Sequence, residues 1–157
     1  MKNLDTKYIL DSTAFYAGLP SLPIKFYTTP QVIDEVKHIK SRYGFIDLLI
    51  ETKRLEVIEP NDEYLQRARE LSFTSGDIKS LSNADLSIIA LALFLNAEVI
   101  TNDYAIINVL RNVNSNVIGK NIRIGKWVRH CTACNVSYSS VYDICNICGN
   151  KLKKRLK

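Results

Sequence analysis

The first 130 residues of this 157-residue chain contain no cysteine, and all four cysteines lie in the last quarter. No apolar run approaches the roughly 20 residues that are needed to cross a bilayer, and the longest, residues 86–95, is interrupted by Ser87. The opening residues MKNLDTKYILD lack the cationic and long apolar regions of a signal peptide. These absences predict a soluble, cytoplasmic protein with no membrane partner.

Several catalytic motifs are also missing. The sequence has no GxxxxGK[ST] phosphate loop and no GxSxG nucleophile elbow. Neither His38 nor His130 has the spacing of a second zinc site or of a nucleophile pair. There is no internal repeat, and the only biased segment is the basic run 151–157, which predicts a solvated, frayed end.

The four cysteines form two C-x2-C pairs, Cys131 with Cys134 and Cys145 with Cys148, separated by ten residues. Two such turns can supply four thiolates to one tetrahedral zinc ion, and a closed site of this kind is structural. The alternative is a pair of disulfides in a secreted protein, which the opening residues argue against. Structural zinc contributes roughly 10 to 16 kcal/mol in finger peptides. Chelation is therefore expected to unfold this end of the chain first.

The charge is divided unevenly along the chain. Residues 1–119 hold 12 basic and 15 acidic side chains, whereas residues 120–157 hold 9 basic side chains and one acid, Asp143, which gives net charges of −3 and +8. A basic end points to a polyanion, most often nucleic acid, and a contribution to solubility is the alternative. The length and this asymmetry predict a first domain at 1–119 and a linker, zinc module and basic tail at 120–157.

The pattern of apolar residues in the first part alternates between strands and helices. Strands are expected at 8–10, 55–58, 98–101 and 116–118, and helices at 14–19, 31–39, 43–53, 62–73, 84–96 and 104–112. Pro30 lies in the first turn of one helix, and Ser82 with Asn83 can cap another. Alternating strands and helices predict an α/β domain with a parallel sheet that is covered on both faces.

Two acids follow predicted parallel strands, where ligands bind in open sheets of this kind. Asp11 comes after the strand 8–10, and Asp103 comes shortly after the strand 98–101. Each could instead cap the helix that follows it. Asp85 is a third acid, in the first turn of an apolar helix, where the helix dipole alone would favour it.

A fourth acid has to be chosen between the neighbours Asp34 and Glu35. At about 100° per residue, Glu35 lies roughly 60° from Val32 on a helical wheel, beside the buried face, whereas Asp34 points nearly opposite. Glu35 is therefore the candidate. Carboxylates that share a cleft repel one another unless a cation neutralises them, and their hard oxygens select Mg²⁺ or Mn²⁺.

Four segments resemble the PIN-domain ribonucleases: YILDSTAF at 8–15, TPQVIDEV at 29–36, NADLSIIALA at 83–92 and VITND at 99–103. The resemblance covers residues 7–118 and implies a three-layer α/β/α fold that cleaves RNA with Mg²⁺ or Mn²⁺. Carried over by motif, it implies a catalytic site of Asp11, Glu35, Asp85 and Asp103, with Thr101 as a nearby hydroxyl. Asp11, Asp85 and Asp103 would hold one or two metal ions, and Glu35 would bind or orient a water.

A PIN domain followed by a zinc ribbon also resembles the compact archaeal form of the endonuclease family that matures the 3′ end of small-subunit ribosomal RNA. This resemblance implies pre-16S rRNA and the pre-30S subunit as partners, and leaves a ribosome-assembly protein open as another. The expected RNA contacts are Lys126, Trp127, Arg129, Lys151, Lys153, Lys154 and Arg155. Trp127, Tyr138 and Tyr142 could equally form the core of the ribbon.

Three other functions remain open at this point. A PIN-type toxin ribonuclease would use the same chemistry on another RNA, although such toxins usually lack a zinc ribbon. A non-catalytic RNA- or ribosome-binding adaptor would retain the fold without cleaving. A DNA-binding zinc-ribbon factor would explain the tail and leave the acids unused.

Overall fold

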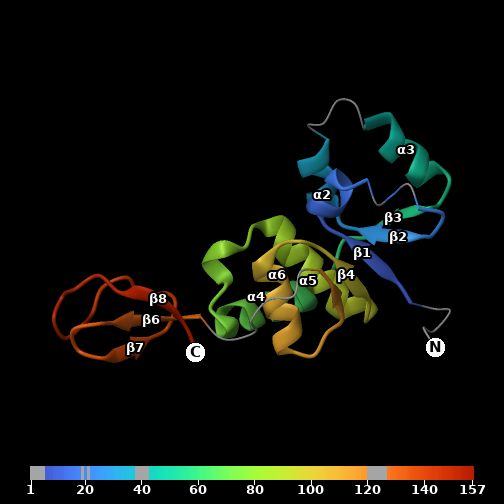
Figure 1. Ribbon diagram of the computed structural model, residues 1–157. Helices are drawn as coiled ribbons and strands as arrows, with labels where there is room; N and C mark the ends of the chain where they lie inside the picture. The colour runs from blue at the N-terminus through green and yellow to red at the C-terminus, as the bar shows by residue number, and fades with distance from the viewer. Residues whose placement is uncertain (1–5, 19, 21, 38–42, 120–126) are drawn as a thin grey trace.

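A computed structural model describes residues 6–18, 20, 22–37, 43–119 and 127–157 (Figure 1). These residues form two separate sheets, a parallel sheet of five strands and an antiparallel sheet of three. Figure 1 shows the small sheet, in orange and red, at the opposite end of the molecule from the blue N-terminal strands. No helix in the described ranges has the length and apolar character of a membrane span.

The large sheet has the strand order β3-β2-β1-β4-β5, with every neighbouring pair parallel. Its strands are β1 (Tyr8–Leu10), β2 (Phe26–Thr28), β3 (Leu55–Val57), β4 (Glu98–Ile100) and β5 (Val117–Ile118). Parallel sheets occur where helices cover both faces. The predicted α/β class with a central parallel sheet is therefore confirmed.

The helices that flank this sheet are α1 (Ser12–Tyr16), α2 (Pro30–Val36), α3 (Tyr43–Glu51), α4 (Asp62–Ser75), the short 3₁₀-helix η2 (Ile78–Ser80), α5 (Asn83–Leu95) and α6 (Tyr104–Asn112). Each of the six α-helices was expected from the sequence. Helix α1 ends before the predicted residue 19 because Gly18 has a φ of 75°, in the left-handed region that glycine tolerates. Residues 38 and 39 of the predicted second helix lie outside the described residues.

Helix α5 is the centre of the core. Ser82 caps it as predicted, and Ile88, Ile89 and Leu91 have no exposed surface. Burying each such side chain contributes roughly 1.5–3 kcal/mol. The hydroxyl of Ser87 on α5 lies 2.7 Å from the hydroxyl of Thr29, the residue that caps α2. The N-terminal parts of the two helices are thereby held together.

Strand β2 was not expected from the sequence. It has only three residues, of which Phe26 and Thr28 are buried, so its alternation is too short to stand out. Its position is set by tertiary pairing, since it lies between β1 and β3.

The small sheet has the order β7-β6-β8, with β6 (Trp127–Cys131), β7 (Val136–Tyr138) and β8 (Lys153–Leu156). The expectation of a frayed end at 151–157 is wrong. Strand β8 pairs with β6 from Trp127 opposite Leu156 to His130 opposite Lys153. Leu152, just before β8, is 3% exposed and packs against the buried cysteines. Although most of the segment is cationic, the buried Leu152 and the backbone pairing of β8 with β6 hold it in the sheet.

Candidate functional site

Asp11 lies directly after β1 and is almost fully buried. Its Oδ1 accepts hydrogen bonds from the Thr13 hydroxyl at 2.7 Å and from the Ala14 N–H at 3.0 Å. Its Oδ2 accepts a hydrogen bond from the Thr101 hydroxyl. Asp11 therefore caps α1, and at the same time its carboxylate is held at the edge of the sheet.

Asp103 follows β4, the strand beside β1. From β1 the chain continues through β2 to β3 at one edge of the sheet, and it then returns to β4 on the other side of β1. The strand order therefore reverses between β1 and β4, and ligands of such sheets bind at the carboxyl ends of the two strands beside the reversal. The Thr101 hydroxyl, which donates to Asp11, accepts the N–H of Asp103 at 2.9 Å. Asp103 also caps α6 through the Ala105 N–H at 2.7 Å. Thr101 therefore links the two acidic loops.

Asp85 lies in the first turn of α5 and forms a reciprocal cap with Ser82. Its Oδ2 accepts the Ser82 N–H at 2.7 Å, and its own N–H donates to the Ser82 hydroxyl at 3.2 Å. Burial raises the pKa of Asp85, and the charges of Asp103 and Asp11 raise it further, against these hydrogen bonds. Asp85 therefore caps a helix and also lies close enough to the other two acids for their charges to raise its pKa.

Glu35 and Asp34 occupy different surroundings on α2. Partial burial raises the pKa of Glu35, and the charges of Asp85 and Asp11 add to the effect. Asp34 is 74% exposed and pairs with Lys37 at 3.3 Å. Both side chains are exposed, and the pKa of Glu35 responds to the charges of Asp85 and Asp11. The choice of Glu35 over Asp34 as a site residue stays a prediction.

The four acids form one electrostatic group. Burial is the main cause of the raised pKa of Asp11, and the charge of Asp103 contributes to it. Such a group is neutralised by protons or by a cation, and its carboxylate oxygens are the donors that Mg²⁺ and Mn²⁺ prefer. Among the described residues, only the cysteines already gather their ligand atoms closely enough to hold an ion.

The cysteines form the second candidate metal site. One sulfur from each of Cys131, Cys134, Cys145 and Cys148 lies within 4.8 Å of the others. The hydroxyl of Tyr138 lies 3.2 Å from the Cys145 sulfur and is the main reason that the pKa of Cys145 is lowered to about 6. Four thiols at one point fit the predicted structural zinc, and Tyr138 belongs to the ribbon core.

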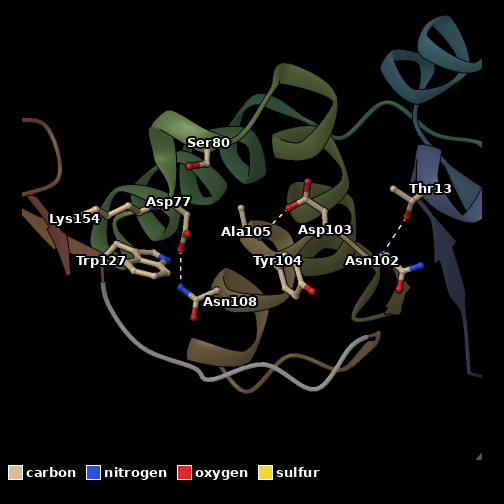
Figure 2. Close-up of a pocket in the computed structure, with 10 residues that line it drawn as sticks. All are labelled: Thr13, Asp77, Ser80, Asn102, Asp103, Tyr104, Ala105, Asn108, Trp127 and Lys154. Carbon is tan, nitrogen blue, oxygen red and sulfur yellow. Dashed lines mark hydrogen bonds between the residues drawn. The ribbon is translucent and has the colours of Figure 1, made fainter. Parts of the chain in front are cut away.

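A cavity of about 440 Å³ lies beside Asp103 and reaches the ribbon (Figure 2). Its lining includes three residues that the sequence did not indicate: Thr13, Asp77 and Asn108. Thr13 lies two residues after Asp11 and binds both its carboxylate and the Asn102 N–H, at 3.1 Å. Asp77 follows Gly76, the residue that ends α4, and an acid at that position could have been noted.

The predicted RNA contacts are scattered over the ribbon. Trp127 is half-buried, and the Lys154 ammonium lies 4.4 Å from the centre of its ring. Arg129 is paired with Asp143 at 3.4 Å. The exposed cations among these predicted contacts are Lys151, Lys153, Lys154 and Arg155. Lys126 lies outside the described residues.

Comparison with known proteins identifies the family of the first part of the chain. The family model described as the PIN domain of ribonuclease matches residues 8–95, which contain Asp11, Glu35 and Asp85. Thr101 and Asp103 lie beyond the matched range, so the structure alone brings them to the other acids.

Three curated relatives align with almost the whole chain. The endoribonuclease Nob1 of Pyrococcus abyssi is 36% identical, with 96% of this chain and 94% of the relative covered. The endoribonuclease Nob1 of Methanocaldococcus jannaschii is 34% identical, with 94% and 77% covered. The ribonuclease VapC1 of Thermoplasma acidophilum is 35% identical, with 94% of this chain and 77% of the relative covered. A match over nearly the whole chain therefore does not distinguish relatives named Nob1 from a relative named VapC1. By its family match and by these relatives, the chain belongs to the PIN-domain ribonucleases.

Proposed function

We propose that this protein is a metal-dependent endoribonuclease that cleaves precursor small-subunit rRNA at its 3′ end. The observation that carries the proposal is the group of four carboxylates at the reversal of strand order, in a chain that is similar to Nob1 endoribonucleases along nearly its full length. The pre-16S rRNA within a pre-30S subunit is the proposed substrate, and the cytoplasm is the proposed location.

Each acid has a proposed role. Asp11, Asp85 and Asp103 would hold one or two Mg²⁺ or Mn²⁺ ions, and Glu35 would bind or orient the attacking water. A divalent ion bound there supplies activation of water and offsets charge on the leaving oxygen. Thr101 fixes Asp11 relative to the loop of Asp103. Burial of Asp11 excludes bulk water from one side of the site.

The test is cleavage mapping on a transcript that spans the mature 3′ end. We expect a single cut near that end when Mn²⁺ is added and none when divalent ions are left out. Asp11→Asn should abolish the cut, whereas Asp34→Asn, which changes an exposed acid on α2, should leave it intact. Full activity of the Asp11→Asn protein would refute the assignment.

The zinc ribbon is proposed to hold the RNA backbone. Its one structural Zn²⁺ would be bound by the four cysteines, and its cations would contact phosphates. The division into a nuclease domain at 1–119 and a linker, ribbon and tail at 120–157 is part of this proposal. Loss of Cys131 or Cys148 is expected to weaken RNA binding and ribbon folding while the acidic site still forms.

The relative named VapC1 keeps a second candidate open, a toxin ribonuclease with another RNA and a protein inhibitor. Such an enzyme would cut RNAs other than the rRNA precursor under the same conditions. A non-catalytic adaptor would bind the precursor equally with and without Mn²⁺ and would produce no cut. The mapping experiment therefore separates all three.

A further inference from the structure

The cavity beside Asp103 is bounded by both parts of the chain. Asp103, Tyr104 and Asn108 line it from α6 and its N-cap, whereas Trp127 and Lys154 line it from β6 and β8 of the ribbon (Figure 2). Its volume of about 440 Å³ falls in the range of roughly 300–1,000 Å³ that is usual for small-ligand sites. The cavity therefore extends from Asp103, a proposed catalytic acid, to the basic ribbon.

The chemistry of the walls changes along the cavity. At the ribbon end there is an indole ring with an ammonium group 4.4 Å from its centre, Trp127 with Lys154. Between the ends, the Asn108 amide donates to Asp77 Oδ2 at 2.6 Å, and the Ser75 hydroxyl donates to the same oxygen at 2.7 Å. A nucleotide binds through an aromatic face for its base, a cation for its phosphate and fixed polar groups for the edge of its base. The cavity offers all three.

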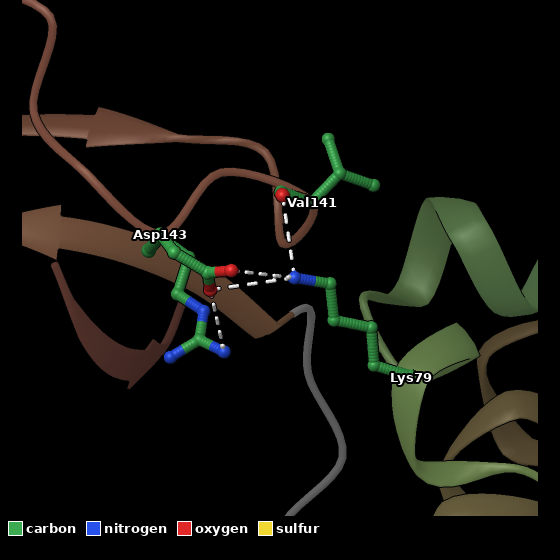
Figure 3. A network of polar contacts seen from close by, with 4 residues as sticks. Lys79, Val141 and Asp143 are labelled. Carbon is green, nitrogen blue, oxygen red and sulfur yellow. Dashed lines mark hydrogen bonds and ion pairs between the residues drawn. The ribbon is translucent and has the colours of Figure 1, made fainter.

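The ribbon end of the cavity is held in place by contacts with the segment that follows α4 (Figure 3). The Lys79 ammonium donates to both carboxylate oxygens of Asp143 at 3.3 Å and to the Val141 carbonyl at 3.2 Å. A Cβ atom on Gly76 would overlap the backbone of Trp127, so these two segments of the chain touch directly there. These contacts fix the indole opposite α6.

We infer that this cavity is a subsite for one nucleotide of single-stranded RNA, next to the phosphate that is cut, with its base against Trp127 and its phosphate at Lys154. The inference rests on the proposed function for the position of the cut, and it adds which groups receive the neighbouring nucleotide. A base enters such a cavity only when it is unstacked, so the substrate at this point is single-stranded. Asp77 acts as a positioning residue, since it holds Asn108 in the wall.

Trp127 is the only tryptophan in the chain, so its fluorescence reports on this cavity alone. The experiment adds a short single-stranded RNA to the full chain, with zinc retained and no Mg²⁺ or Mn²⁺, and follows indole emission together with the anisotropy of a label on the RNA. We expect the indole emission to be quenched as RNA is added and to level off at the same RNA concentration as the anisotropy. An abasic strand of equal length should bind more weakly and leave the emission nearly unchanged.

Lys154→Ala is compared with Lys7→Ala, a control outside the ribbon. Both side chains are exposed and each loss removes one charge, but only Lys154 lines the cavity. We expect Lys154→Ala to weaken RNA binding on the order of tenfold and Lys7→Ala to have a much smaller effect. Trp127→Phe, which keeps an aromatic ring in β6, should weaken binding less than Trp127→Ala.

Several outcomes would overturn the subsite. RNA that binds by anisotropy without changing the emission would place it elsewhere, and so would equal losses in the two lysine variants. Equal quenching by the abasic strand would mean a site for phosphate alone. The binding experiment needs no cleavage, so the subsite and the proposed nuclease function can fail independently. If bound bases quench the indole in a protein that never cuts RNA, the subsite stands and the nuclease function fails. If the protein cuts RNA while the indole emission stays unchanged, the subsite is refuted.

Discussion

At the scale of single residues, the Thr101 hydroxyl is the group that joins the two acidic loops, because it donates to Asp11 and accepts the Asp103 N–H. We expect Thr101→Val to lower the cleavage rate by on the order of 10- to 100-fold, since a hydrogen bond to a charged group is worth about 1.5–3 kcal/mol. The measurement is the single-turnover rate at saturating Mn²⁺. Thr101→Ser keeps the hydroxyl and should retain most of the rate.

Loss of the Thr101 hydroxyl should also affect folding. Thr101 is 3% exposed, so the valine variant leaves the Asp103 N–H without this acceptor and also lowers the thermal midpoint. The assay is therefore run well below that midpoint. A valine variant that cuts as fast as the wild type would show that the hydroxyl does not matter for the reaction.

The raised pKa of Asp11 predicts a pH dependence of stability. Burial raises this pKa from 3.8, so between 3.8 and the raised value the folded state binds more protons than the unfolded state. Stability that comes from the protonated carboxyl is thus present below 3.8 and is lost as pH rises through the folded-state pKa. Relative to wild type, Asp11→Asn should become more stable as pH rises through that window and then level off.

This difference is measured by urea unfolding at a series of pH values without added Mg²⁺ or Mn²⁺. Because both proteins contain the same zinc ribbon, loss of zinc at low pH affects them alike and cancels in the comparison. A difference that stays constant with pH would contradict the raised pKa.

Some of the candidate site residues can be predicted from local sequence patterns, and others cannot. Glu35 is preferred to Asp34 because helical periodicity places it nearer the buried face of α2, and its raised pKa, to which Asp85 and Asp11 contribute, is compatible with that choice. Asp77 and Thr13 were missed because their roles depend on partners far along the chain, such as Asn108 and Asn102. No local pattern contains that information.

At the scale of elements, the ribbon depends on its cysteines. Its buried cluster is Cys131, Cys145 and Leu152, with Cys134 and Tyr138 partly buried against it, which is too small to stabilise three strands without a metal. We expect a zinc chelator to remove amide protection from β6, β7 and β8 while β1 and β4 stay protected. Hydrogen exchange read by mass spectrometry checks this, with excess Zn²⁺ restoring protection. Simultaneous loss in both sheets would contradict it.

The elements also show where sequence patterns stop being informative. Long amphipathic or apolar segments such as α5 were predicted nearly to the residue, with the Ser82 cap included. Strand β2 was missed and β8 was mistaken for a loose tail, since each is short and defined by the strand it pairs with. For β8, charge dominates the composition, yet backbone pairing decides the structure.

At the scale of the whole molecule, Lys79 of η2 and Asp143, between β7 and β8, connect the first part of the chain to the ribbon across an exposed contact. Such a pair contributes about 0.2–1 kcal/mol. We expect Lys79→Glu to loosen the ribbon and so reduce RNA binding several-fold, because the new charge faces Asp143. Lys79→Gln, which removes charge without repulsion, should have a smaller effect.

The measurement is RNA affinity at low and high salt. Salt screens exposed charges, so the difference between Lys79→Glu and wild type should shrink as ionic strength rises. If the two variants bound RNA as tightly as wild type at low salt, the ion pair would have no part in placing the ribbon.

The order of the strands along the chain also bears on how the protein is made. The parallel sheet is finished at Ile118, whereas β6 has to wait for residues 153–156 before its second neighbour exists. Because domains fold as units with the N-terminal one first during synthesis, the acidic edge forms before the ribbon closes. On the proposed function, a nascent chain would therefore carry its cutting edge before it acquires the wall that holds Trp127 and Lys154, and selectivity for RNA would mature later than the capacity for hydrolysis.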